Sequence, residues 1–141
     1  MNQPALSLPS AAQKGLLPMM LNHDARVTHD VGATADFHSR VLGMKLASTI
    51  MDDQVPSTGD AFPYFHAFFR MGDGSTMAFF ECTELPLPVP VSHPAYAVLD
   101  HMALQVADVR ELAVWKEWLV SQGVEVLGPV DHKGLIHSIS T

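Results

Sequence analysis

Two histidines and one glutamate in this sequence, His23, His101 and Glu81, could together bind a divalent metal ion. Neutral imidazole is a good ligand for Zn, Ni, Fe and Mn, and a catalytic metal site needs about three protein ligands with open positions for substrate. Glu81 ends the apolar run Thr76–Phe80, where a carboxylate without a partner would be costly to bury. The sequence therefore favours a two-histidine, one-carboxylate site, with an exposed strand end as the alternative for Glu81.

Three other histidines are candidates for acid–base catalysis, because imidazole changes its charge near neutral pH. His66 lies among phenylalanines on a predicted strand, and His132 and His137 flank a loop near the end of the sequence. Alternate residues of a strand share a face, so His66 is expected to line the cleft. The other histidines have no comparable partners and are expected to be structural: His29, His38 and His93.

The two candidate histidine ligands occupy equivalent places in an internal repeat. The segments His23–Val31 and His101–Val109 share His, Ala, Asp and Val in the same order, and each shared residue in the second segment lies 78 positions after its counterpart. In each copy a short β-prone run leads into Asp, a segment with helical periodicity and then Gly. If the two copies pack about a pseudo-twofold axis, both histidines point into one cleft.

Helix boundaries are marked in both copies. Asp30 and Asp108 are predicted N-caps, and Glu111 completes a capping-box pattern with Asp108. Gly43 and Gly123 fit the left-handed position just after a helix end. One apolar stripe at three-to-four spacing runs along each predicted helix, with Val31, Thr34, Phe37 and Val41 in the first and Val109, Leu112, Trp115 and Leu119 in the second.

Strand signals follow the first helix. Residues 44–51, 64–71 and 76–82 are β-prone, and Gly72-Asp73-Gly74-Ser75 between the last two is a strong hairpin signal. The predicted order is βαβββ for module one, residues 21–82. Residues 83–97 contain four prolines, which cannot donate to a sheet ladder, and are predicted to be a linker.

Module two, residues 98–141, repeats the pattern in part. A strand is predicted from Val98, followed by the helix, a strand near 124–127, a turn at Gly128-Pro129 and a strand from about Leu135. The last strand of a complete second copy is missing from the sequence. A truncated sequence is favoured over a protein that lacks this strand, because loss of the strand would expose the neighbouring sheet edge.

Composition limits the class of protein. A chain of 141 residues with 48% hydrophobic residues is expected to form one α+β domain, residues 21–141. Residues 1–20 are expected to form a flexible arm, and they lack the features of a signal peptide. No apolar run approaches the ~20 residues of a membrane span. Net charge −7 disfavours nucleic acid and anionic lipid as partners. Cys82 stands alone, which favours a buried, inert thiol in a reducing, cytoplasmic compartment.

The sequence resembles the vicinal-oxygen-chelate superfamily, which includes glyoxalase I, extradiol dioxygenases and bleomycin-resistance proteins. The resemblance rests on His23, on Thr34–Met44, on Ser75–Glu81 and on Asp100–Leu104, within a stretch of about 21–139. It implies two βαβββ modules with cupped mixed β-sheets around one metal pocket, and a homodimer. His23 and His101 match the two histidine ligands of the family, and Glu81 matches the carboxylate of glyoxalase-like members.

The resemblance leaves the activity open between three alternatives. Segments 128–132 and 136–139 are closer to the extradiol branch, in which Fe(II) binds a catechol-like diol and O2 while His132 or His137 handles protons. That branch takes its carboxylate from the last strand of the second module, which is missing here. The alternatives are a glyoxalase-like lyase or isomerase that uses Zn or Ni with Glu81, and a metal-free protein that binds or sequesters a small molecule. Mn is a further candidate metal.

Overall fold

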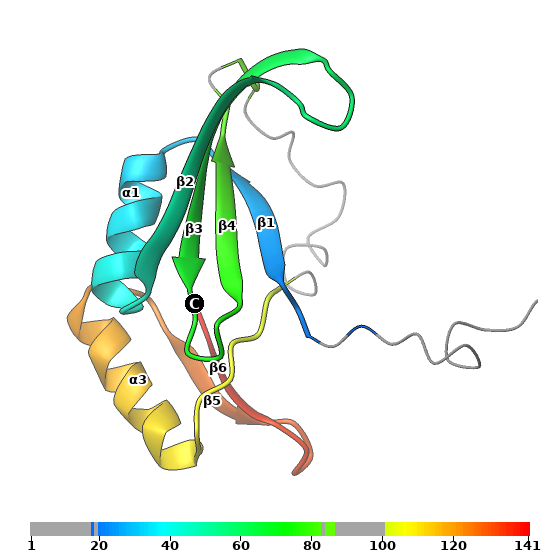
Figure 1. Cartoon of the computed structure of the whole chain (residues 1–141). Helices are drawn as coiled ribbons and strands as arrows, with labels where there is room; N and C mark the ends of the chain where they lie inside the picture. The colour runs from blue at the N-terminus through cyan, green and yellow to red at the C-terminus, as the bar shows by residue number, and fades with distance from the viewer. Residues whose placement is uncertain (1–17, 19, 83, 87–100) are drawn as a thin grey trace, which may run out of the picture. The chain divides into compact units, whose positions relative to one another are not determined.

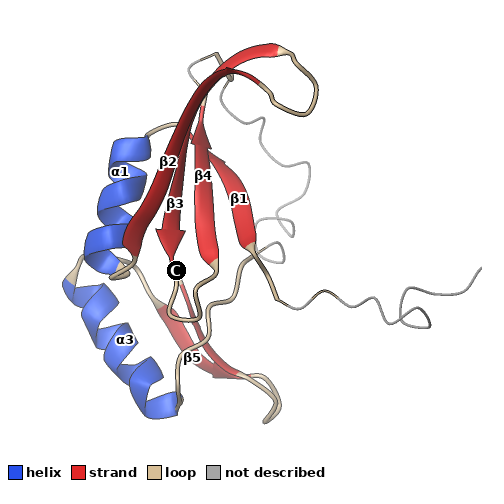
Figure 2. Ribbon diagram, viewed as in Figure 1, coloured by secondary structure: helices blue, strands red, loops and turns tan. Residues whose placement is uncertain are grey.

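The computed structural model describes residues 18, 20–82, 84–86 and 101–141. The chain forms two compact units, residues 1–85 and 86–141, and each is described by itself (Figures 1 and 2). Most of the expected arm and of the expected linker, as well as His93 and residues 98–100, lies outside the described residues. None of the described helices is both long and apolar enough to cross a membrane.

The first unit has the predicted βαβββ order. Its elements are β1 (His23–Thr28), α1 (Val31–Asp36) with the π-helical turn η2 (Phe37–Val41), β2 (Lys45–Gln54), β3 (Ala61–Arg70) and β4 (Thr76–Glu81). The sheet order is β1-β4-β3-β2, with β1 parallel to β4 and the other neighbours antiparallel. β2 is therefore an edge strand, and all of its residues are exposed.

The predicted turn and cap residues stabilise these elements. The Asp30 carboxylate accepts a hydrogen bond from the Ala33 amide at 2.8 Å, which satisfies a free donor of the first helical turn. The β3–β4 hairpin is closed by the Met71 amide, which donates to the Ser75 carbonyl at 2.9 Å. Gly74 in that turn has a φ of 92°, a conformation that glycine adopts without strain. Gly43, after η2, is likewise left-handed.

Strand register divides the side chains of this sheet between two faces. The helix face packs on α1 and η2: Phe69, which is fully buried, and Phe79 lie 5.2 and 4.5 Å from the buried ring of His38. The other face, called here the histidine face, follows from the alternation of side chains along each strand. It comprises His23, Ala25 and Val27 of β1, Thr76, Ala78 and Phe80 of β4, and Tyr64, His66, Phe68 and Arg70 of β3.

The second unit contains α3 (Val109–Ser121) and a two-stranded antiparallel sheet of β5 (Leu127–Asp131) and β6 (His137–Ser140). The Asp108 carboxylate accepts hydrogen bonds from the first-turn amides of Arg110 and Glu111, at 2.8 and 2.9 Å. Glu111 in turn accepts from the Ala107 amide at 2.6 Å. These contacts confirm the predicted helix start in the second copy.

Three predictions for the second unit are wrong. Residues 124–126, expected to lie in a strand, have no strand structure, because β5 begins at Leu127. Residues 101–106, expected to form the strand that carries His101, have no strand structure. In the first unit β1 pairs only with β4, and the described part of the second unit has no equivalent of β4 to pair with this segment. Gly128 and Pro129, expected to form a turn, lie within β5 at an irregularity in its register, where a missing amide donor is tolerated.

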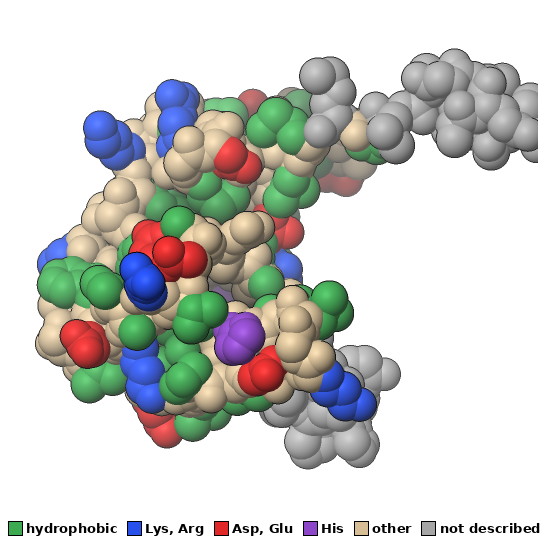
Figure 3. All heavy atoms as spheres, turned by 90° about the horizontal axis from the view of Figure 1, so that it is seen from below, with side chains coloured by type: hydrophobic (Ala, Val, Ile, Leu, Met, Phe, Trp, Pro, Cys, Tyr) green, Lys and Arg blue, Asp and Glu red, His purple; other side chains and the backbone are tan. Residues whose placement is uncertain are grey.

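Hydrophobic side chains reach the surface of both units. The exposed set includes Leu46, Ile50 and Met51 on β2, Val114 and Trp118 on α3, and Leu135 and Ile136 in the β5–β6 connection. On the face seen in Figure 3, Lys and Arg side chains are interspersed with Asp, Glu and hydrophobic ones and do not form one continuous basic area.

Candidate functional site

His23 is the first residue of β1, and its ring is oriented by a neighbour. Its Nδ1 lies 2.7 Å from Oδ1 of Asn22. An amide oxygen can only accept a hydrogen bond, so Nδ1 carries the proton and Nε2 keeps its lone pair. The side chain is exposed. A histidine whose second nitrogen donates to an oxygen is typical of metal ligands, so the residue fits the ligand role that was predicted for it.

His66 is buried on the same face between two phenylalanine rings. Its ring stacks on Phe80, with centroids 3.5 Å apart and planes 17° apart, and lies 4.1 Å from the centroid of Phe68. Only 6% of the residue is exposed, and its buried Nε2 has no hydrogen-bond partner in the part of the chain that the structure describes. Leaving such an atom unsatisfied costs about 1–3 kcal/mol, so the position has a stability cost that a purely structural residue would avoid.

Electrostatics keep the His66 ring neutral. Burial lowers the pKa of His66 below its ordinary value, and the positive charge that His23 can carry lowers this pKa further. The imidazole is therefore uncharged at pH 7 and able to accept a proton. Perturbed histidines of this kind are common in active sites.

A continuous row of rings connects the two histidines. The His23 ring lies edge-on to Phe68 with centroids 5.8 Å apart, and Tyr64 lies edge-on to Phe80 at 5.3 Å. Together with the stacked His66, the row covers β1, β3 and β4 of the histidine face. A planar apolar molecule would find aromatic surface there, with imidazole groups at two points along the row.

Glu81 lies on the helix face and not beside His23. In the parallel β1–β4 pair, His23 is opposite Thr76 and Glu81 is opposite Thr28, at the other end of the strands. Thr76 and Glu81 are an odd number of residues apart, so their side chains point to opposite faces. Oε1 of Glu81 accepts a long hydrogen bond, 3.4 Å, from the Val31 amide at the start of α1. The expectation that Glu81 completes a metal site with His23 is corrected accordingly.

Replacing Glu81 with alanine tests this correction. We expect the metal content of the protein to be unchanged and its stability to fall by about 0.5–1 kcal/mol, because the Val31 amide loses its acceptor. Metal analysis and urea unfolding measure the two quantities. Glu84→Ala, which removes an exposed carboxylate three residues further on, is the matched control. Loss of bound metal in the Glu81 variant alone would restore Glu81 as a ligand.

The candidate histidines of the second unit are exposed. Nε2 of His132 lies 2.9 Å from Oγ of Ser138, and Nε2 of His137 lies 3.9 Å from Oδ1 of Asp131, both within the β5–β6 hairpin. His101 lies in the irregular segment before α3. Among the described residues, no three or more His, Cys, Asp or Glu side chains are grouped so that they could hold a metal ion.

Two of the three histidines that were expected to be structural, His38 and His29, and Cys82 are among the described residues. Nδ1 of His38 donates to the Thr34 carbonyl at 2.8 Å, and burial lowers the pKa of His38 despite this bond, which acts in the opposite direction. His29 is exposed beyond the end of β1. Burial, followed by the nearby charge of Glu81, raises the pKa of the Cys82 thiol, so the thiolate needed for nucleophilic chemistry is disfavoured.

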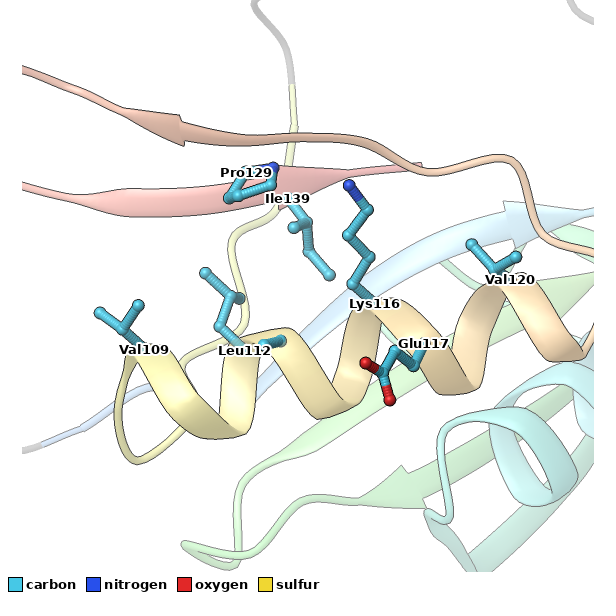
Figure 4. A pocket seen from close by; sticks show the side chains of 8 residues that line it. Val109, Leu112, Lys116, Glu117, Val120, Pro129 and Ile139 are labelled. Carbon is cyan, nitrogen blue, oxygen red and sulfur yellow. The ribbon is translucent and has the colours of Figure 1, made fainter.

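The second unit contains a cavity of about 360 Å³ between α3 and its hairpin (Figure 4). Its lining is mainly apolar and includes Val109, Leu112 and Val120 of α3, with Pro129 of β5 and Ile139 of β6. Lys116 crosses to the hairpin, where its Nζ donates to the Gly128 carbonyl. None of the predicted site residues lines this cavity. The cavity lies between α3 and the two-stranded sheet of β5 and β6.

A comparison with protein families decides the relationship that the sequence suggests. The family model described as Glyoxalase/Bleomycin resistance protein/Dioxygenase superfamily matches residues 20–139. The chain belongs to this superfamily. Both the family and the mixed α+β fold expected from the resemblance are confirmed. Sequence reasoning missed Asn22 as the partner of His23, although a polar residue directly before a candidate ligand is a usable signal.

Solved structures support the glyoxalase/dioxygenase fold. A mutant of the fosfomycin resistance protein FosX from Listeria monocytogenes, complexed with Mn(II) and 1S,2S-dihydroxypropylphosphonic acid, matches with TM-score 0.55 and 16% identity over 84% of this chain and 80% of that one. An integron cassette protein from the mobile metagenome of the Halifax Harbour sewage outfall gives 0.53 and 19%, over 84% and 83%. A glyoxalase/dioxygenase from Nostoc punctiforme gives 0.52 and 20%, over 89% and 85%. No curated protein matches the sequence.

Proposed function

We propose that this superfamily member is a metal-dependent enzyme of the extradiol type, which binds Fe2+ and cleaves a catechol-like diol with O2. The observation that carries the proposal is the pair of imidazoles on the histidine face. His23 presents an unprotonated Nε2, and His66 is buried and neutral among aromatic rings on the same face. A ligand and a proton acceptor are thus combined with a surface suited to an aromatic substrate.

Several residues of the histidine face, together with Asn22 and His101, have separate roles in this proposal. His23 and, by the sequence repeat, His101 supply the imidazole ligands of the ion, and Asn22 fixes the tautomer of His23. The ion, when bound, supplies positive charge that favours deprotonation of the diol and brings the diol together with O2. Phe68 and Phe80 pack against the substrate ring and exclude water. His66 accepts a proton from a substrate hydroxyl and, because its pKa is low, releases it readily.

The position of Glu81 counts against the glyoxalase-like alternative, in which this carboxylate would act at the metal ion. The resemblance gives glyoxalase-like members a carboxylate from the first module, and here that carboxylate lies on the helix face beside Val31. The acid–base roles of His132 and His137, the homodimer and the cytoplasmic location stay predictions.

Metal analysis and two activity assays test the proposal. Protein purified without chelator is expected to contain iron, or to accept Fe2+ on anaerobic reconstitution, and to consume O2 when a catechol is added. Turnover of a hemithioacetal of glutathione with Zn2+ or Ni2+, without O2 uptake, would support the glyoxalase-like alternative. Protein that retains no Fe, Mn, Zn or Ni after reconstitution would reject both enzyme proposals and leave the metal-free binding protein.

A further inference from the structure

Two basic side chains face each other at one end of the histidine face. Lys45 of β2 and Arg70 of β3 are directly opposite partners in the antiparallel ladder, so their side chains lie on the same side of the sheet. Both residues are exposed. Like charges directly opposite each other destabilise a sheet. A pair that carries this cost is a candidate for a role outside stability.

Neither cation has an acidic partner among the residues that the structure describes. In the same unit, Arg26 pairs with Asp24 at 2.7 Å and Arg40 with Asp36 at 2.9 Å. The protein as a whole carries a net charge of −7, so available carboxylates outnumber basic groups. Two cations that lie opposite each other on neighbouring strands therefore form a local site for an anion.

The basic pair lies next to the proposed catalytic residues. Arg70 is opposite Thr76 of β4, and Thr76 is opposite His23 of β1, so the three residues form one row across the sheet. With strands about 4.8 Å apart, the Cα atoms of Arg70 and His23 are separated by roughly 10 Å. Phe68, which contacts both His66 and His23, is two residues from Arg70 on the same face. Both side chains rise from the same face, so one small aromatic molecule with substituents at both ends could contact them together.

We infer that Lys45 and Arg70 bind a carboxylate of the substrate, which is therefore an aromatic acid and not a neutral diol. The inference deepens the proposed function and rests on it for the placement of the diol at His23. The Arg70 guanidinium matches a carboxylate with two parallel hydrogen bonds, and Lys45 adds a second charge. The aromatic row lies against the ring, and the buried Nε2 of His66 is a polar group that a substrate hydroxyl could satisfy.

Calorimetric titration of the 141-residue chain, with and without bound metal, tests this inference. The three probes are 3,4-dihydroxybenzoate, catechol and benzoate. Wild-type protein should bind 3,4-dihydroxybenzoate at least tenfold more tightly than catechol, and this preference should decrease as salt is raised. Arg70→Ala should abolish the preference without changing the affinity for catechol. Lys45→Ala should reduce the preference several-fold, and Arg70→Lys should retain part of it.

Controls separate this site from a general charge effect and from loss of fold. Lys133→Ala removes an exposed cation of the second unit and should leave all three affinities unchanged. The melting temperature of unliganded Arg70→Ala should equal or exceed that of the wild type, because a like-charge contact is relieved. Equal affinity of the wild type for the acid and for catechol, an undiminished preference in Arg70→Ala, or no binding of either carboxylate would each overturn the inference. A charge preference without O2 uptake would instead reject only the proposed reaction.

Discussion

Protein carrying His23→Ala is expected to retain less than about a tenth of the metal bound by the wild type after dialysis. The contact of 2.7 Å with Asn22 fixes the tautomer of the neutral His23 ring, which leaves the Nε2 lone pair available to a metal ion. Loss of a ligand lowers affinity by more than the ten- to hundredfold typical of a lost outer partner. Elemental analysis gives the stoichiometry, and competition with a chromophoric chelator gives the affinity. His101→Ala should have the same effect.

Two variants make this result specific. His29→Ala removes another exposed histidine of the first unit and should leave metal binding unchanged. Asn22→Ala keeps His23 but removes the hydrogen bond that fixes its tautomer, so the affinity for the metal ion should fall by about tenfold. Far-ultraviolet circular dichroism should be the same for all variants, because the ring of His23 is exposed. Full metal content in both His23→Ala and His101→Ala would refute the site.

Phe69→Ala is expected to lower the free energy of unfolding by about 3–5 kcal/mol, the range observed for large-to-small changes in a core. Phe69 is completely buried, between the ring of His38 at 5.2 Å and that of Phe79 at 6.1 Å. Its removal leaves a cavity under η2 that the sheet cannot close. Since small proteins have about 5–15 kcal/mol of stability in total, a large part of the variant would unfold on mild heating. Urea unfolding followed by circular dichroism measures the loss.

The neighbouring Phe68→Ala is the matched control, since it makes the same change on the opposite face. Phe68 is only partly buried, so the loss of stability should be less than half as large. The variant should instead raise the pKa of His66, because water reaches a ring that Phe68 now covers at 4.1 Å. A histidine titration by NMR detects this change. A larger loss of stability for Phe68→Ala than for Phe69→Ala would contradict the assignment of faces.

Local signals in the sequence predicted most of the first unit. Asp30 and Gly43 mark the ends of the first helical segment, and Gly74 closes the predicted hairpin. Each acts through its own backbone neighbours and needs no information from distant residues. The repeat also located His23 at the start of a strand. The order of the elements could therefore be obtained from residue types alone.

The candidate site depended on information that the sequence does not contain. Whether Glu81 and His23 share a face is decided by the register between β1 and β4, two strands separated by most of the first unit. A change of one residue in that register would reverse the answer, because side chains alternate along a strand. The missing strand structure of residues 101–106 has a similar origin, since a strand forms only with a hydrogen-bonding partner.

The ten exposed residues of β2 have a consequence for how the protein behaves at high concentration. One side of this strand has no neighbour in the sheet, so its backbone amides and carbonyls could pair with those of another polypeptide. Asp52 and Asp53 place two negative charges near its end, and charged side chains on an outer strand oppose such pairing. Colloidal stability of this small acidic protein thus depends in part on carboxylates remote from any chemistry, and acidification that neutralises them would favour aggregation through this strand.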